Sequence, residues 1–179
     1  MYFSQFPMMV YDLKGDKKFK LLPDILRRVK LRAGLSASRF VFDKYNVKEN
    51  ENPEDVAFKY YGDPTYHWVV LMVNNITDRY YQWPMNQADF ADFLTDKYGA
   101  GNEDATHHHE LAQTSGKTTS IDDSHMLEVN SDTDGATTIT NRQYEERVQN
   151  DLRQIRLLDE RYLDAFTEEF FALIRKDKF

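Results

Sequence analysis

The sequence predicts an α+β protein, and three observations carry this prediction. Residues 40–47 are β-branched and aromatic, which is the composition of a strand. Apolar residues recur every three or four positions after Asn52-Pro53 and again after Thr140, which is the spacing of one helix face. Aromatic residues make up 14% of the 179 residues, a share that is too high for a disordered chain.

Residues 1–36 are predicted to form a basic, aromatic arm and a short helix. The first 20 residues show no clear period, so we expect an extended arm there. A helix is expected over residues 21–35, because Pro23 suits a first turn and Gly34 suits a helix end. The apolar positions at helical spacing are Leu22, Ile25, Leu26 and Val29. The other face of this helix carries Arg27, Arg28, Lys30 and Arg32.

Residues 37–98 are predicted to form a small core and one further helix. The strand at 40–47 opens the core, and a helix capped by Asn52 and ended by Gly62 follows it. A second helix runs from residue 65 to about residue 73, and the aromatic segment at 80–84 is interpreted as a strand. The order of the core is therefore β-α-α-β. Its predicted apolar interior contains Phe40, Phe42, Val47, Trp68, Val69, Leu71 and Met72.

The rest of the chain is predicted to be an insertion followed by a helical region. A helix is expected over residues 86–98. Residues 99–140 are mostly polar, so we expect a loop or hairpin insertion there. Residues 141–179 are predicted to be helical, with a break at a short strand over 153–158 and with Phe166 and Phe170 in the apolar stripe of the last helix.

The charge is distributed unevenly along the chain. Residues 1–48 carry 11 Lys/Arg and 4 Asp/Glu, whereas residues 49–179 carry 12 and 26. A basic arm on an acidic body can dock onto an acidic surface or fold back on its own body. The overall charge of −7 and the lack of a base-stacking motif argue against nucleic-acid binding. No apolar run is long enough to predict a membrane span.

Two segments resemble metal sites but lack essential features. His107-His-His-Glu110 offers nitrogen and oxygen ligands without the spacing of a zinc helix. Asn130-x-Asp132-x-Asp134-Gly135 resembles half of a calcium loop, but Asn141 stands where the bidentate Glu belongs. The chain has no cysteine and no phosphate-binding or nucleophile motif. We therefore expect no enzyme, no cofactor and no metal.

Exposed aromatic and basic residues are the remaining candidates for function. Tyr80, Tyr81 and Trp83 lie on a predicted strand, whose consecutive residues face opposite ways, so at least one of them should be exposed. Exposed aromatic and Arg side chains often anchor protein interfaces. The predicted partner-binding residues are Arg27, Arg28, Lys30, Arg32, Tyr80, Tyr81 and Trp83.

The sequence resembles the fifty-three-type baseplate wedge subunit of contractile-tailed bacteriophages. The motifs that carry this resemblance are Tyr2-Phe-Ser-x-Phe-Pro7, Arg27-Arg-Val-Lys30, Pro53-Glu-Asp55, Tyr61-Gly-Asp-Pro64, His67-Trp-Val-Val-Leu-Met72, Asn74-Asn75, Asp78-Arg-Tyr-Tyr-Gln-Trp-Pro84, Tyr144-Glu-Glu-Arg147 and Arg153-Gln-Ile-Arg-Leu-Leu158. The β-α-α-β segment also resembles a LysM module, in which the second helix ends at a turn similar to Asn74-Asn75-Ile76. Residues 99–135 lie outside both resemblances.

The resemblance implies a structural virion protein of the tail baseplate, present in the host cytoplasm during assembly. Its implied partners are other wedge subunits, namely the helical wedge core and the sheath-initiating subunit, together with neighbouring wedges or the hub. In this family the subunit helps to join wedges into a ring. The alternative is a LysM-type module that binds peptidoglycan.

Overall fold

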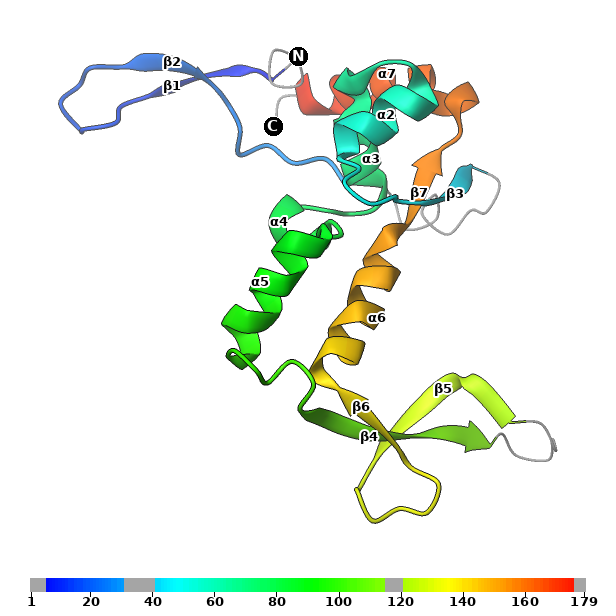
Figure 1. Cartoon of the computed structure of the whole chain (residues 1–179). Coiled ribbons are helices and arrows are strands. Elements are labelled where there is room, and N and C mark those ends of the chain that lie inside the picture. Colours follow the sequence, from blue (N-terminus) through cyan, green and yellow to red (C-terminus); the bar gives the residue numbers. More distant parts are fainter. Residues whose placement is uncertain (1–5, 31–40, 115–120, 176–179) are drawn as a thin grey trace. The chain divides into compact units, whose positions relative to one another are not determined.

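The computed structural model describes residues 6–30, 41–114 and 121–175, and it divides the chain into two compact units (Figure 1). Unit 1 combines residues 1–83 with residues 154–179, and unit 2 is the intervening segment, residues 84–153. Unit 2 is therefore inserted between the two segments of unit 1. The sequence analysis instead predicts four segments that follow one another along the chain. None of the described helices is both long and apolar enough to cross a bilayer.

Unit 1 begins with an antiparallel hairpin and not with the predicted helix. Strand β1 (Met8–Tyr11) pairs with β2 (Lys20–Pro23), so that Val10 lies opposite Leu21. Residues 24–30 form a turn and irregular backbone, and residues 31–40 lie outside the described part. The helix predicted over 21–35 is thus wrong in its described portion. The pairing of β2 with β1 outweighs the helical spacing of Leu22, Ile25, Leu26 and Val29.

The core of unit 1 packs three helices against a second two-stranded sheet. Strand β3 (Phe42–Asn46) pairs antiparallel with β7 (Gln154–Leu158). The helices are α2 (Pro53–Tyr61), α3 (His67–Val73), which follows the short 3-10 turn η2 (Pro64–Tyr66), and α7 (Leu163–Arg175), which follows η3 (Glu160–Tyr162). The strand predicted at 80–84 is wrong, because residues 79–82 form the short helix α4 (Arg79–Gln82).

The predicted core residues lie in or against this core. Trp68 is buried, and its ring centroid lies 4.5 Å from that of Phe170 and 6.2 Å from that of Phe166. Val69 and Phe170 are also buried, and Leu71, Met72 and Phe166 are half-buried against the same cluster. Phe42 and Val47 are buried as predicted, whereas Phe40 lies outside the described residues.

Asn74 joins the end of α3 to the edge of β7. Its side-chain amide donates to the carbonyl of Val70 at 2.8 Å and to the carbonyl of Arg156 at 2.7 Å, while its Oδ1 accepts from the N–H of Arg156 at 2.8 Å. The side chain of Asn74 therefore both donates to and accepts from the backbone of Arg156, in the same way as the backbone of a neighbouring strand.

Replacing Asn74 with alanine is expected to lower the unfolding free energy of unit 1 by about 2–3 kcal/mol, because three partly buried hydrogen bonds are lost. Both tryptophans lie in unit 1, so urea unfolding followed by tryptophan fluorescence measures the change. Asn74→Asp keeps the acceptor for Arg156 but places a carboxylate oxygen against the carbonyls of Val70 and Arg156, so it should lose at least as much. Equal stability of all three proteins would contradict this role of Asn74.

Unit 2 contains two helices and a three-stranded antiparallel sheet. The helices are α5 (Gln87–Tyr98) and α6 (Asn141–Arg153), and the strands have the order β5 (Ile121–Val129), β4 (Thr106–Thr114), β6 (Thr137–Thr140). The predicted polar insertion is thus a sheet. Thr140 caps α6, because its Oγ1 accepts from the N–H of Gln143 and its own N–H donates to the side chain of Gln143.

The buried face of α6 consists of polar residues. The apolar spacing after Thr140 predicts that apolar residues would be buried there instead. Asn141, Glu145 and Gln149 are buried at four-residue steps. The carboxylate of Glu145 accepts from Lys97 Nζ at 2.6 Å and from the Tyr98 hydroxyl at 2.7 Å. Hydrogen bonds and an ion pair therefore hold α6 to α5, where a helix pair usually relies on apolar side chains.

Candidate interaction surfaces

The β1–β2 hairpin exposes apolar side chains on both faces. Cross-strand pairing places Met8, Val10, Leu21 and Pro23 on one face, and all four are exposed, with Val10 and Leu21 at 63% and 62%. On the other face, Tyr11 and Leu22 are exposed as well. Further exposed apolar side chains beside the strands are Leu13, Phe19, Ile25 and Leu26. A continuous exposed apolar surface of this kind marks an interaction site.

The base of the hairpin is fixed to unit 1 by one of the predicted partner-binding residues. Arg27 pairs with Asp24 at 3.0 Å and donates to the carbonyl of Ile174 at 3.1 Å, so its guanidinium stabilises the chain's own fold. Arg28 and Lys30 are exposed. Arg32 lies outside the described residues. The structure therefore leaves Arg28 and Lys30 as the exposed members of the predicted basic face.

Trp83 is buried and belongs to the core of unit 1. Its side chain is 5% exposed, and its Nε1 donates to the backbone carbonyl of Glu51 at 2.8 Å. In this conformation the indole cannot reach a partner. The sequence could not reveal this, because the partner of Trp83 lies 32 positions earlier in the chain.

Tyr80 and Tyr81 form an exposed aromatic pair on α4. Their exposed fractions are 85% and 71%. The turn that carries them is fixed at several points: Asp78 accepts from the N–H of Tyr80 at 2.9 Å, and Arg79 pairs with Glu54 at 3.1 Å and with the side chain of Asn52 at 2.8 Å. The backbone of α4 is therefore fixed at this position, and it presents both tyrosine side chains to solvent. Tyr side chains have few rotatable bonds and so lose little entropy on binding.

The buried carboxylate of Glu51 connects β3, the turn that follows it and α2. Glu51 accepts from the Tyr45 hydroxyl at 2.9 Å and from the N–H of Lys48 at 2.8 Å, and it pairs with Lys59. Burial opposes ionisation of Glu51, but the hydrogen bonds from Lys59, Lys48 and Tyr45 outweigh it, so the pKa of Glu51 lies below its ordinary value of 4.5. Burial and the bond to Glu51 together raise the pKa of Tyr45 to about 12.

The histidine run lies on β4 and makes contacts within unit 2. The register of β4 against β6 shifts between Thr106 and His108, so the histidines do not simply alternate. The ring of His107 stacks on Tyr144 at 4.1 Å, and its Nδ1 lies 2.7 Å from that of His108. Within the described ranges, no three His, Asp or Glu side chains are grouped so that they could hold a metal ion.

Glu110 links β4 to α6. Its carboxylate accepts from Arg147 at 2.6 Å and lies 2.7 Å from His108 Nε2. Burial opposes its ionisation, yet the hydrogen bonds from Arg147 and His108 prevail and hold the pKa of Glu110 below its ordinary range.

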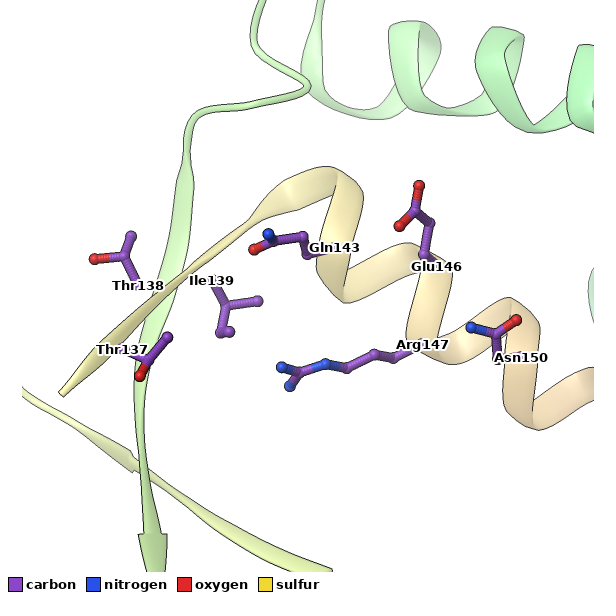
Figure 2. A pocket seen from close by; sticks show the side chains of 7 residues that line it. All are labelled: Thr137, Thr138, Ile139, Gln143, Glu146, Arg147 and Asn150. Carbon is purple, nitrogen blue, oxygen red and sulfur yellow. The ribbon is translucent and has the colours of Figure 1, made fainter. Parts of the chain in front are cut away.

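A shallow polar pocket lies between β6 and α6. Its volume is about 370 Å³, and Figure 2 shows Arg147 reaching from α6 toward the residues of β6. The residues that line it are Thr137, Thr138, Ile139, Gln143, Glu146, Arg147 and Asn150. Ile139 is buried, and the guanidinium of Arg147 is paired with Glu110, so the pocket offers few groups for a ligand.

The β1–β2 hairpin is a candidate interaction surface whose paired strands the sequence reasoning missed. Its signal was present as two short apolar runs, residues 8–11 and 21–23, separated by a loop with Gly15. Gly15 and Lys17 adopt positive φ values of 69° and 63°, and the carboxylate of Asp12 accepts from three backbone N–H groups of this loop. An Asp-x-x-Gly loop between two apolar runs could have indicated the turn.

Comparison with known proteins gives two findings. A family model described as Base plate wedge protein 53 matches residues 18–118. Over 112 residues the chain is 30% identical to a protein described as Baseplate wedge protein gp53 from Enterobacteria phage T4. This match covers 60% of the chain and 57% of the T4 protein, so it spans little more than half the length of that relative.

Proposed function

Because this chain belongs to the Base plate wedge protein 53 family, we propose that it is a non-catalytic subunit that holds other subunits of a phage tail baseplate together. It acts in the virion, and it is present in the host cytoplasm while the particle is assembled. The observation that carries this proposal is the exposed apolar and aromatic surface of unit 1, at the β1–β2 hairpin and at Tyr80 and Tyr81.

Two kinds of partner follow from this proposal. The first is the helical wedge core with the sheath-initiating subunit, for which the exposed Tyr80 and Tyr81 supply aromatic anchors. Arg28 and Lys30 add positive charge for acidic partner surfaces. The second is the neighbouring wedge or the hub, which the subunit joins into a ring.

The double variant Tyr80→Ser/Tyr81→Ser is expected to lower recovery of the chain with co-expressed wedge subunits by at least about tenfold. Each exposed anchor contributes on the order of 1–2 kcal/mol to binding, and tenfold corresponds to about 1.4 kcal/mol. The measurement is the amount of wedge protein retained by the affinity-tagged chain.

Tyr162→Ser is the matched control, because Tyr162 is an exposed tyrosine of unit 1 outside α4. Its recovery should equal that of the unchanged protein. Full recovery of the Tyr80/Tyr81 variant would contradict the placement of the contact. Failure of the unchanged chain to bind any wedge subunit would contradict the proposed function itself.

The core of unit 1 supports a LysM-like interpretation with a different closing strand. The order β3, α2, α3 is completed by β7, which pairs antiparallel with β3 after unit 2 has intervened along the chain. We interpret this as a β-α-α-β core whose second strand follows a long insertion.

A LysM-like core keeps peptidoglycan binding as a second candidate function. The observation in its favour is that the exposed Tyr80 and Tyr81 neighbour polar groups of α4 and its preceding turn, since aromatic faces beside polar side chains suit sugar rings. Sedimentation with purified cell wall separates the two functions. Retention on cell wall without binding to wedge subunits would favour the glycan-binding module.

A further inference from the structure

The structure shows a β1–β2 hairpin whose apolar faces no described part of the chain covers. An isolated two-stranded hairpin is marginally stable in water, so a covering surface is needed to hold it in this form. Within the described ranges the chain's own body does not supply this cover, because Phe6 and Val29 pack on the core while Val10, Leu13 and Leu21 are exposed. The contact between Arg27 and Ile174 fixes the base of the hairpin in this arrangement.

The charge of the hairpin selects the kind of surface that can cover it. Residues 6–30 carry seven Lys/Arg against three Asp/Glu, and four of the lysines lie at or beside the tip: Lys14, Lys17, Lys18 and Lys20. Two such hairpins would repel each other, which argues against hairpin-to-hairpin pairing. An acidic surface with accessible apolar groups is complementary to the hairpin in both respects.

The outer face of α7 has this chemistry. The exposed positions along one side of the helix are Ala165, Glu168, Glu169 and Ala172, with Leu173 at the edge and 44% exposed. Glu168 and Glu169 form no ion pair among the residues that the structure describes, whereas the inner face of the helix packs Phe170 and Ile174 into the core. The small side chains of Ala165 and Ala172 on either side of the two acids leave room for a flat ribbon to approach the helix.

We propose that the β1–β2 hairpin of one copy of this chain docks on the outer face of α7 of a second copy. The apolar hairpin face covers Ala172 and Leu173, and the lysines of the tip pair with Glu168 and Glu169. Because the two surfaces are different, the contact can repeat from one copy to the next, as a closed ring requires. The inference deepens the proposed function, on which it rests for the role of the hairpin, and names a second copy as one of the partners.

The test is the association state of the purified full chain, measured by sedimentation velocity. The unchanged chain should associate at about 100 µM, and its dissociation constant should rise at least about tenfold between about 50 mM and about 500 mM salt. Leu21→Asp should abolish association, and Leu127→Asp, an exposed leucine on β5 of unit 2, should leave it unchanged.

A charge-exchange experiment identifies the occupant. Glu168→Lys/Glu169→Lys and Lys17→Glu/Lys18→Glu should each weaken association at least about tenfold when tested alone, because like charges then meet. An equimolar mixture of the two variants should associate again, since each hairpin then meets a face of opposite charge.

A monomeric unchanged chain, or a mixture of the two charge variants that stays monomeric, would overturn the proposal. Binding of the tagged chain to wedge subunits through Tyr80 and Tyr81 is measured separately. The failure of self-association and the failure of the proposed function are therefore distinguishable.

Discussion

Replacing Trp68 with alanine is expected to lower the unfolding free energy of unit 1 by about 3–5 kcal/mol, the usual cost of removing a large aromatic side chain from a core. Trp68 is buried between α3 and α7, where its ring contacts Phe166, Phe170 and Phe171. Removal of the indole leaves a cavity among these phenylalanine rings. Urea unfolding followed by the fluorescence of the remaining Trp83 measures the loss.

Trp68→Phe is the matched variant for this prediction. It keeps an aromatic ring against the same neighbours and should lose no more than about 2 kcal/mol. An unfolding free energy of Trp68→Ala within about 1 kcal/mol of the unchanged protein would contradict the packing of α7 on α3.

Glu51→Ala is expected to lower the unfolding free energy of unit 1 by about 2–4 kcal/mol, because it leaves the Tyr45 hydroxyl and the Lys48 N–H without their buried acceptor. The pair with Lys59 contributes less, since the Lys59 side chain is 54% exposed. Glu54→Ala is the matched control, because Glu54 forms an exposed ion pair and its loss should cost less than about 1 kcal/mol. Equal losses for Glu51→Ala and Glu54→Ala would contradict the supporting role of Glu51.

The same carboxylate gives a pH dependence of known sign. The pKa of Glu51 in the folded protein lies below 4.5, so its ionisation stabilises the fold at pH values above about 4.5. This contribution is lost as the pH falls through the folded pKa. The stability difference between the unchanged protein and Glu51→Gln should therefore shrink as the pH falls below about 4.5. A difference that grows on acidification would contradict the lowered pKa.

The parts of the fold that the sequence predicts are those with local signals. Pro53 begins α2 after the predicted cap Asn52, the side chain of Asn86 caps α5, and Asp159 accepts from the N–H of Arg161 at the turn before α7. In each case the signal and the group that it satisfies lie within three residues of each other. The strand β7 at Gln154–Leu158 also follows from a local break in helical spacing.

The parts that the sequence does not predict depend on distant partners. Tyr45 on β3 lies opposite Ile155 on β7, with the whole of unit 2 between them along the chain, so this pairing has no local signature. Trp83 is buried because its indole reaches the carbonyl of Glu51. The buried polar face of α6 was missed for the same reason, since the partners of Glu145 lie on α5.

The difference between local and distant contacts also determines which of the candidate interaction residues are exposed. Tyr80 and Tyr81 remain available because the helix α4 turns Trp83 inward and leaves both tyrosines exposed. Of the predicted basic face, Arg27 stabilises the chain's own fold, and Arg28 and Lys30 are exposed. Exposed aromatic and basic side chains of this kind suit the proposed contact with other subunits.

A density map of the intact phage particle tests this account most directly. The account predicts that the chain lies in the baseplate, with Tyr80 and Tyr81 buried against another wedge subunit and the β1–β2 hairpin covered by a neighbouring copy. A particle whose baseplate lacks the chain, or in which these side chains face solvent, would contradict it.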